Sequence, residues 1–120
     1  MEALYARLTL RKMNKQLSQL YIHDSLTGLY NRMAYEKLAM PLFHQCMQEN
    51  QPVGIMFVDA DHLKYINDTF GHDMGNLAIS SIASVLRQHC PAESVSIRYG
   101  GDEFVCVIPD YNKQKIQELA

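Results

Sequence analysis

The sequence has few cysteines, no excess of basic residues and no long apolar run. Its cysteines, at positions 46, 90 and 106, form no Cys-x-x-Cys pair, which argues against a zinc site or a disulfide framework and fits a reducing cytoplasm. The 11 basic residues face 13 acidic ones. A role in coating nucleic acid is therefore disfavoured, because neutralising phosphates requires clustered lysine and arginine. No stretch approaches the roughly 18 apolar residues of a membrane span, so we expect no membrane segment in this chain.

The composition fits one globular domain behind a helical segment. The chain has 120 residues, of which 48% are hydrophobic, enough for one modest core. Apolar residues follow the a and d spacing of a short heptad pattern at Ala3, Ala6, Leu10, Met13, Leu17 and Leu20. We predict a helical linker over residues 1–22 and a domain over 23–120. Two interpretations of the linker stay open: it pairs with a second copy through residues 3–20 in a homodimer, or it lies on its own domain.

The next segments predict a turn, a second helix and a strand. Asp24 is a candidate N-cap or turn residue, and Gly28 permits a left-handed turn. A second helix is expected from about Arg32 to Glu49, with a kink or break at Pro41. The apolar run of residues 53–58 predicts a buried central strand.

The second half of the chain predicts a helix followed by a hairpin. Turns are expected at residues 67–68 and 71–72, and a helix from Gly75 to about His89. Two strands, 95–99 and 104–108, flank a Gly100-Gly101 turn, and a polar, helical segment follows Pro109. This order is most of a βαββαβ ferredoxin-like unit. The predicted fold class is α/β (α+β), with a palm-type, antiparallel-rich sheet, flanking helices and an N-terminal helix, but without the final strand.

This topology would bring three carboxylates to one edge of the sheet. The first strand ends at Asp59, and the third begins at Asp102 and Glu103. Repulsion makes such a cluster costly unless a cation compensates it, and oxygen ligands suit Mg²⁺ or Mn²⁺. Gly100 and Gly101 would let a phosphate approach the backbone. The combination indicates phosphoryl or nucleotidyl transfer.

Each feature taken alone has an ordinary structural interpretation. A Gly-Gly turn between strands is most often only a hairpin, and an Asp-x-Asp sequence after a strand is often a turn with a helix cap. A single histidine such as His72 is more often a surface residue than a ligand. The Gly-Gly turn, the Asp-x-Asp sequence and the histidine therefore indicate a site only in combination.

Three motifs in the same order resemble the GGDEF (diguanylate cyclase) family. The motifs cover residues 24–32 (DSLTGLYNR), 57–72 (FVDADHLKYINDTFGH) and 98–104 (RYGGDEF). The resemblance covers about residues 22–120, with the heptad helix as a linker typical of the family. It implies a Mg²⁺-dependent enzyme that joins two GTP molecules into cyclic di-GMP, with two domains facing each other as a dimer.

The resemblance also implies a role for individual residues. It assigns metal binding to Asp59, the backbone carbonyl of Ala60, Asp102 and Glu103, of which Asp102 and Glu103 are also catalytic. It assigns substrate contacts to Lys64 at the triphosphate, Asn67 at the guanine edge, His72 and the position of Asn76. Gly100 and Gly101 are candidate substrate-binding residues because of their open backbone.

The sequence departs from the family pattern in three places, and each departure limits which family properties are expected of this chain. Asn76 stands where the family usually has an aspartate, and an amide offers only one acceptor oxygen to the guanine edge. Pro91 and Ser94 occupy the positions of an Arg-x-x-Asp product-inhibition site, so feedback through that site is not expected. The family continues with further strands and a helix, so the chain is expected to hold only the front part of the domain.

Four function hypotheses therefore remain open. The intact signature at residues 100–104 favours a diguanylate cyclase, or part of one. Asn76 and the short C-terminal part favour an inactive or regulatory nucleotide-binding or dimerisation module. The heptads alone would fit a helical interaction segment. A related palm-type cyclase or polymerase shares the carboxylates but does not need the 24–32 motif.

Overall fold

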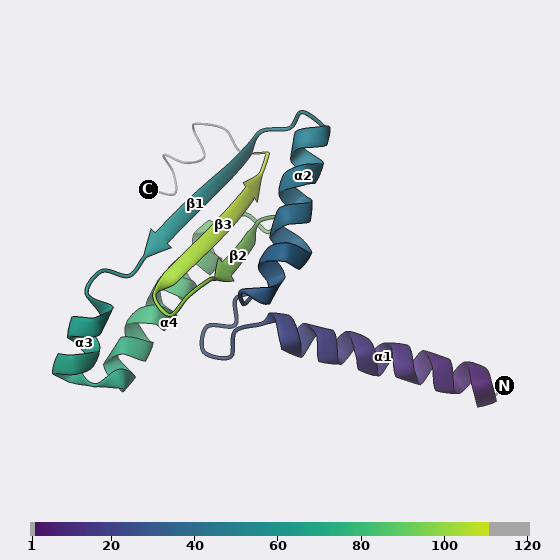
Figure 1. Ribbon diagram of the computed structural model, residues 1–120, viewed down its shortest axis with the longest axis horizontal. Coiled ribbons are helices and arrows are strands. Elements are labelled where there is room, and N and C mark those ends of the chain that lie inside the picture. The colour runs from purple at the N-terminus through teal and green to yellow at the C-terminus, as the bar shows by residue number, and fades with distance from the viewer. Residues whose placement is uncertain (1, 111–120) are drawn as a thin grey trace.

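The computed structural model describes residues 2–110, and Figure 1 shows how the elements are arranged. The elements in chain order are α1 (Glu2–Ile22), the π-helix η1 (Tyr35–Ala39), α2 (Met40–Gln48), β1 (Val53–Asp59), α3 (Leu63–Phe70), α4 (His72–His89), β2 (Val95–Arg98) and β3 (Glu103–Pro109). The mixed helical and antiparallel fold class is confirmed. The helix expected after Pro109 lies outside the described residues.

The three strands form one antiparallel sheet in the order β1-β3-β2. All side chains from Phe104 to Ile108 in β3 are buried, because both faces of this middle strand are covered. The prediction that residues 53–58 form the central strand is wrong for the described residues, where β1 lies at an edge of the sheet. An apolar run predicts burial but does not identify a strand's neighbours.

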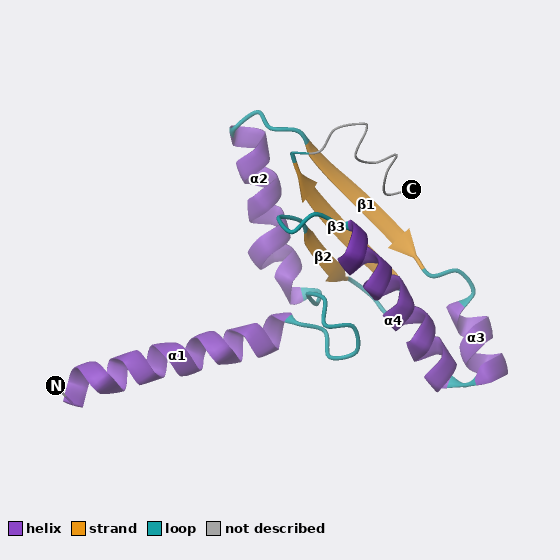
Figure 2. Cartoon of the chain, turned by 180° about the vertical axis from the view of Figure 1, so that it is seen from behind, coloured by secondary structure: helices purple, strands orange, loops and turns teal. Residues whose placement is uncertain are grey.

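Helices cover the two faces of the sheet. On one face, α4 packs Ile79, Ala83 and Leu86 against Phe104 and Cys106 of β3. Figure 2 shows α4 in front of this face of the sheet. On the other face, Ala39 of η1 packs with Ile97 and Val107. Alternation of side chains in β3 supplies both contacts, because successive residues point to opposite faces.

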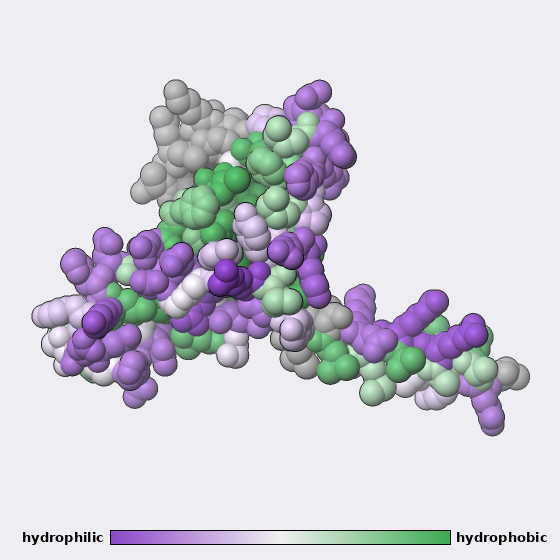
Figure 3. Space-filling model, viewed as in Figure 1, coloured by the Kyte–Doolittle hydropathy of each residue, from purple (hydrophilic) through white to green (hydrophobic). Residues whose placement is uncertain are grey.

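The second face is covered only in part. Ile55 and Phe57 of β1 are 46% and 78% exposed, and with Tyr35, Phe43 and Val105 they line a groove of about 210 Å³. Figure 3 shows apolar residues gathered beside α2 on this side of the molecule. The groove reaches the turn between β2 and β3 at Tyr35, whose ring centroid lies 5.5 Å from that of Tyr99.

The helix α1 projects from the domain (Figure 1). Its side chains from Glu2 to Leu17 are all exposed, including Leu10, Met13 and Leu17 of the heptad pattern. The interpretation that the linker lies on its own domain is therefore wrong for this structure. No helix in the described part of the chain is both long and apolar enough to span a bilayer.

Pro41 is accommodated without a full break. The predicted helix of residues 32–49 is present as η1 followed by α2, with Pro41 in the first turn of α2. The amide of Met40 bonds to the carbonyl of Tyr35, the wider spacing of a π-turn. This turn widens just before Pro41, whose ring and missing N–H disturb a regular helix.

The helix α3 was not predicted from the sequence. Asn67 and Asp68 lie inside it, so the turn predicted there is wrong, whereas Gly71 does form a turn, with φ 95°. The helix α4 begins at His72 rather than at Gly75. Leu63 packs against the core formed with α4, and this tertiary contact overrides the turn preference of Asn and Asp.

Candidate active site

The turn between β2 and β3 is closed by bonds to one carbonyl. The amides of Tyr99 and Gly100 both donate to the carbonyl of Glu103, at 2.8 and 3.2 Å. The carboxylate of Glu103 lies over Gly100, so a Cβ at that position would stand 3.3 Å from its Oε1 atom. Gly100 therefore leaves the room that this carboxylate occupies, while a Cβ at Gly101 would meet nothing within 4 Å.

The backbone brings the expected metal-binding residues together. Asp59 stands directly opposite Glu103 in the β1–β3 register. The amide of Ala60 donates to the carbonyl of Asp102 at 2.8 Å. The end of β1 and the start of β3 therefore meet at one edge of the sheet, as the topology requires.

The side chains do not form the expected three-carboxylate cluster. Within residues 2–110, no three His, Cys, Asp or Glu side chains are arranged to hold a metal ion. Glu103 folds over Gly100, and Asp102 lies in the turn before β3 rather than in the strand. Asp59 and Glu103 are exposed and Asp102 is half-buried.

The α3–α4 hairpin supplies the expected substrate residues. It follows the end of β1 (Figure 1), with Lys64 and Asn67 on α3 and His72 and Asn76 at the start of α4. Lys64, His72 and Asn76 are exposed, and Asn67 is half-buried. The side chain of Asn67 lies on Gly75, where an added Cβ would fall 1.7 Å from its Oδ1 atom. The structure therefore holds the amide of Asn67 next to the backbone that carries Asn76.

The connecting loop, residues 23–31, forms a closed turn beside β2, to which the backbone of Tyr30 bonds. The Asp24 carboxylate accepts bonds from the amide and hydroxyl of Thr27, at 2.9 and 2.8 Å. The amide of Gly28, at φ 74°, donates to the carbonyl of Asp24 at 2.8 Å. Asp24 is therefore a turn residue, and the predicted left-handed conformation of Gly28 is confirmed.

Arg98 joins this loop to the β2–β3 turn. Its Nη1 atom lies 3.3 Å from Oδ1 of Asp24, and its Nη2 atom donates to the carbonyl of Gly101 at 2.9 Å. Partial burial alone raises the pKa of Asp24, but the bonds from Thr27 and the charge of Arg98 outweigh it, so the pKa lies below its ordinary value. The contact between Asp24 and Arg98 was not predicted, because no local pattern links positions so far apart.

Comparison with known proteins decides the family. The family model described as "Diguanylate cyclase, GGDEF domain" matches residues 21–120 of this chain. The chain belongs to the GGDEF family. Among curated relatives, diguanylate cyclase VdcA of Vibrio cholerae is 36% identical over 118 residues, covering 96% of this chain and 34% of that protein. The bifunctional diguanylate cyclase/cyclic di-GMP phosphodiesterase MucR of Pseudomonas aeruginosa is 35% identical over 83% of this chain and 15% of its own length.

A solved structure supports the GGDEF fold and the position of the helix. The coiled coil and GGDEF domain of DgcB from Caulobacter crescentus, solved in complex with c-di-GMP, superposes with a TM-score of 0.85 at 25% identity. The alignment covers 98% of this chain and 64% of that one. The chain thus spans about a third or less of the curated relatives described above, at 34% and 15% of their lengths.

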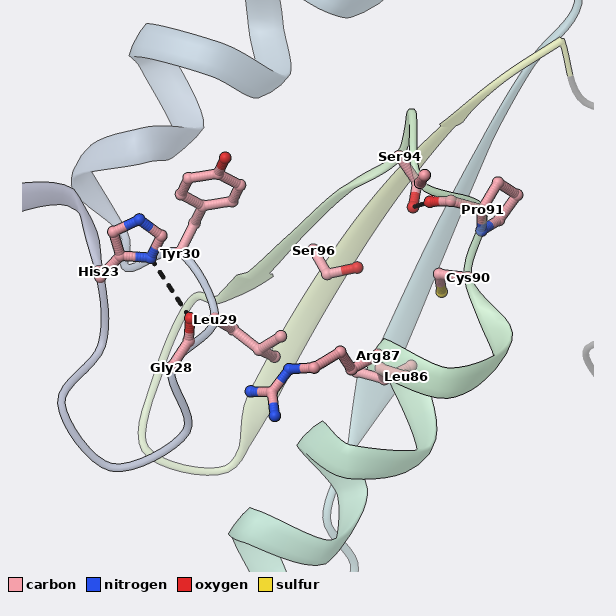
Figure 4. A pocket seen from close by; sticks show the side chains of 11 residues that line it. His23, Gly28, Leu29, Tyr30, Leu86, Arg87, Cys90, Pro91, Ser94 and Ser96 are labelled. Atoms are coloured by element: carbon pink, nitrogen blue, oxygen red, sulfur yellow. Dashed lines mark hydrogen bonds between the residues drawn. The ribbon is translucent and has the colours of Figure 1, made fainter. Parts of the chain in front are cut away.

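Pro91 and Ser94, two positions where this GGDEF domain departs from the family pattern, line a pocket. The pocket, of about 240 Å³, opens between the connecting loop, the end of α4 and β2, as Figure 4 shows. The Ser94 hydroxyl donates to the carbonyl of Pro91, and Arg87 donates to the carbonyl of Thr27. Positions 91 and 94 therefore bond to each other and offer no charged side chain to a ligand.

Proposed function

We propose that this chain is the nucleotide-binding part of a diguanylate cyclase domain, which condenses two GTP molecules into cyclic di-GMP with Mg²⁺ or Mn²⁺ in bacterial second-messenger signalling. The observation that carries the proposal is the backbone arrangement at one edge of the sheet. Asp59 faces Glu103, and Ala60 bonds to Asp102, beside the α3–α4 hairpin. A cytoplasmic location and the division into a linker, residues 1–22, and a domain, residues 23–120, belong to the same proposal.

The hairpin residues would hold the nucleotide. The exposed ammonium of Lys64 is suited to the triphosphate as a point charge. Asn67 and Asn76, on facing helices, would read the guanine edge through amide donors and acceptors. His72 would add a further contact, and Gly100 and Gly101 would leave backbone accessible to phosphate.

The oxygen donors at the edge of the sheet fit a hard divalent cation. Asp59, Asp102 and Glu103 supply carboxylates and Ala60 supplies a carbonyl, which are the ligands that Mg²⁺ prefers. A cation bound there neutralises negative charge on the phosphates. The exposure of Asp59 and Glu103 lets both side chains change rotamer on binding, because exposed side chains do so within nanoseconds.

Asp102 would act as the base of the reaction. The 3′-oxygen of one GTP bonds to the α-phosphorus of the other, pyrophosphate leaves, and the 3′-hydroxyl proton passes to a carboxylate. A second transfer with the roles of the two nucleotides exchanged closes the ring and releases a second pyrophosphate. Two nucleotides must therefore face each other, and this requires two domains if each holds one.

The helix α1 offers a means of pairing two domains. Leu10, Met13 and Leu17 repeat at heptad spacing and are each more than half exposed, at 59%, 53% and 61%. Burying such a stripe against its symmetry mate removes apolar surface from water. We propose a parallel homodimer through residues 3–20, completed by the two GGDEF faces.

A regulatory module is the second candidate. Asn76 weakens the expected guanine contact, and the described carboxylates are not gathered around a metal site. One relative of this chain, 37% identical over 94 residues, is named cyclic di-GMP phosphodiesterase NbdA of Pseudomonas aeruginosa. In this alternative the domain binds a nucleotide weakly or not at all and acts through dimerisation.

The test is a direct assay of product. The purified chain is incubated with Mg²⁺ and GTP, or with ATP, and cyclic dinucleotides are measured by mass spectrometry. Cyclic di-GMP that disappears with Asp102→Ala is the expected result. Absence of product, with GTP binding measured by calorimetry or with dimerisation alone, would replace the enzyme with the regulatory module. Absence of product, binding and dimerisation would remove both candidates. Analytical ultracentrifugation tests the dimer, which Leu10→Asp should dissociate and the matched surface change Lys12→Asp should not.

A further inference from the structure

The guanidinium of Arg98 touches two segments that the chain separates widely. One side lies 3.3 and 3.4 Å from the carboxylate oxygens of Asp24. The other side, Nη2 and Nε, donates to the carbonyl of Gly101 at 2.9 and 3.3 Å. The side chains of both Arg98 and Asp24 are only 19% exposed, so this pair is shielded more than an ordinary surface ion pair.

The carbonyl that Arg98 holds belongs to the peptide unit that leads into Asp102. A peptide unit is planar. Fixing the oxygen of Gly101 therefore also fixes the direction of the Asp102 amide and the position of the Asp102 Cα atom. Glycine has the largest conformational freedom of any residue. Two successive glycines directly before Asp102 therefore need a restraint if its side chain is to have one position.

The other bonds of the turn hold the amides of Tyr99 and Gly100 and the carbonyl of Asp102, and Arg98 holds the carbonyl of Gly101. The ring of Tyr99 is held by the Arg32 guanidinium, 4.7 Å from its centroid, and by the ring of Tyr35 at 5.5 Å. Glu103 is fixed in β3 opposite Asp59. Between these anchors, the carbonyl of Asp102 binds Ala60, and the carbonyl of Gly101 binds Arg98.

We propose that Arg98, oriented by Asp24, is the positioning residue of the candidate active site, because it fixes the Gly101–Asp102 peptide. Asp24 suits this role because Thr27 already holds its carboxylate with two bonds. The catalytic meaning of the proposal rests on the cyclase function proposed above. The ordering of the turn at residues 100–102 by Arg98 does not depend on that function.

An arginine is required for this arrangement. Its planar fork reaches two partners at once, whereas a lysine ammonium on a flexible stem is a compact point charge. Arg98→Lys should therefore keep the pairing with Asp24 but lose the fixed contact with Gly101. Asp24→Asn keeps an oxygen for Thr27 but removes the charge that orients Arg98.

The first arm of the test measures order in the turn and needs no activity. Amide ¹⁵N relaxation on the full 120-residue chain gives order parameters for the Gly101 and Asp102 amides. In Arg98→Met and Arg98→Lys we expect them to fall from about 0.85 to below about 0.6, while the rest of β3 keeps its values. If Arg98→Met does not fold, Asp24→Asn gives the same test with a milder change.

Arg87→Lys is the matched control. Arg87 bonds to the same loop, at the carbonyl of Thr27, but not to the turn. The Arg87→Lys substitution should leave the order parameters of the Gly101 and Asp102 amides unchanged. Unchanged order in Arg98→Lys, Arg98→Met and Asp24→Asn would overturn the proposal, as would an equal loss in Arg87→Lys.

The second arm measures the reaction. With GTP and Mg²⁺, Asp24→Asn and Arg98→Lys should lower kcat about a hundredfold, the loss that a 1 Å misplacement produces, while KM stays within about twofold. A rise in KM with unchanged kcat would contradict positioning of Asp102. If the wild-type chain forms no product, the proposed cyclase function fails for this chain, and the relaxation arm alone decides the positioning proposal.

Discussion

Replacing Gly75 with alanine tests the placement of Asn67 against α4. A Cβ added at Gly75 would lie 1.7 Å from Oδ1 and 2.8 Å from Cγ of Asn67. Real Cβ atoms essentially never approach a heavy atom closer than 3.0 Å. The amide of Asn67 must therefore move away in Gly75→Ala, and with it the group proposed to read the guanine edge.

Two opposing effects set the expected change in stability. Gly75 lies inside α4 and has no positive φ, so alanine gains about 0.8–1.0 kcal/mol of helix propensity. Overpacking a buried contact costs roughly 1–3 kcal/mol. Gly75→Ala should therefore lower the free energy of unfolding by about 0–2 kcal/mol. In an Asn67→Ala background the obstacle is absent, so the same change should stabilise the protein by about 1 kcal/mol.

Urea unfolding of the four proteins in this double-mutant cycle measures the coupling. We expect a coupling free energy of about 1–3 kcal/mol between positions 67 and 75, the range for residues in contact. The m-values should stay equal, so that shifts in midpoint report stability. Equal stabilisation by Gly75→Ala in both backgrounds would show that the Asn67 side chain does not lie on Gly75, and would refute the reasoning.

Three further predictions concern other residues. Asn76→Asp should tighten GTP binding about tenfold, as one stronger charge-assisted bond implies, measured by calorimetry; weaker binding would contradict the guanine contact. The pKa of Asp24 lies below its ordinary 3.8, so its stabilisation is present above pH 3.8 and lost as pH falls through the folded-state value; the stability difference between wild type and Asp24→Asn should therefore shrink below pH 3.8 in acid unfolding, and a constant difference would contradict this. Burial, opposed by a bond from Ser96 and reinforced by Cys90, raises the pKa of Cys106 to about 12, so iodoacetamide at pH 8 should alkylate Cys106 only after unfolding, as peptide mass mapping would show.

The local features of the fold were predictable because they depend on nearby residues. The β2–β3 hairpin follows from alternating apolar positions on either side of Gly100-Gly101, and the turn at Gly28 follows from the freedom of glycine at positive φ. The edge of the sheet where Asp59 meets Glu103 followed from topology. These predictions needed only periodicity and chain direction.

The remaining features depend on contacts that periodicity does not report. The helix α3 contains Asn67 and Asp68, which favour turns, and it is stable because it packs on α4. The exposure of Phe57 depends on which elements lie beside β1, not on its own apolar run. The direction of the Glu103 side chain depends on the empty space above Gly100. Side-chain convergence therefore could not be inferred from strand order alone.

Arg98 belongs with the features that depend on contacts between distant parts of the chain. The residue occurs in a recognisable motif, yet its role is visible only because the chain brings residue 24 to residue 98, 74 positions later. The connecting loop that carries Asp24 also carries Asn31, whose amide bonds to the carbonyl of Ile22 at 2.7 Å, in the last turn of α1. The end of α1, the loop and the β2–β3 turn are thus joined by successive hydrogen bonds at one end of the sheet. If α1 pairs two domains as proposed, the same contacts fix where each domain presents its Asp102, so dimer geometry and active-site geometry would change together.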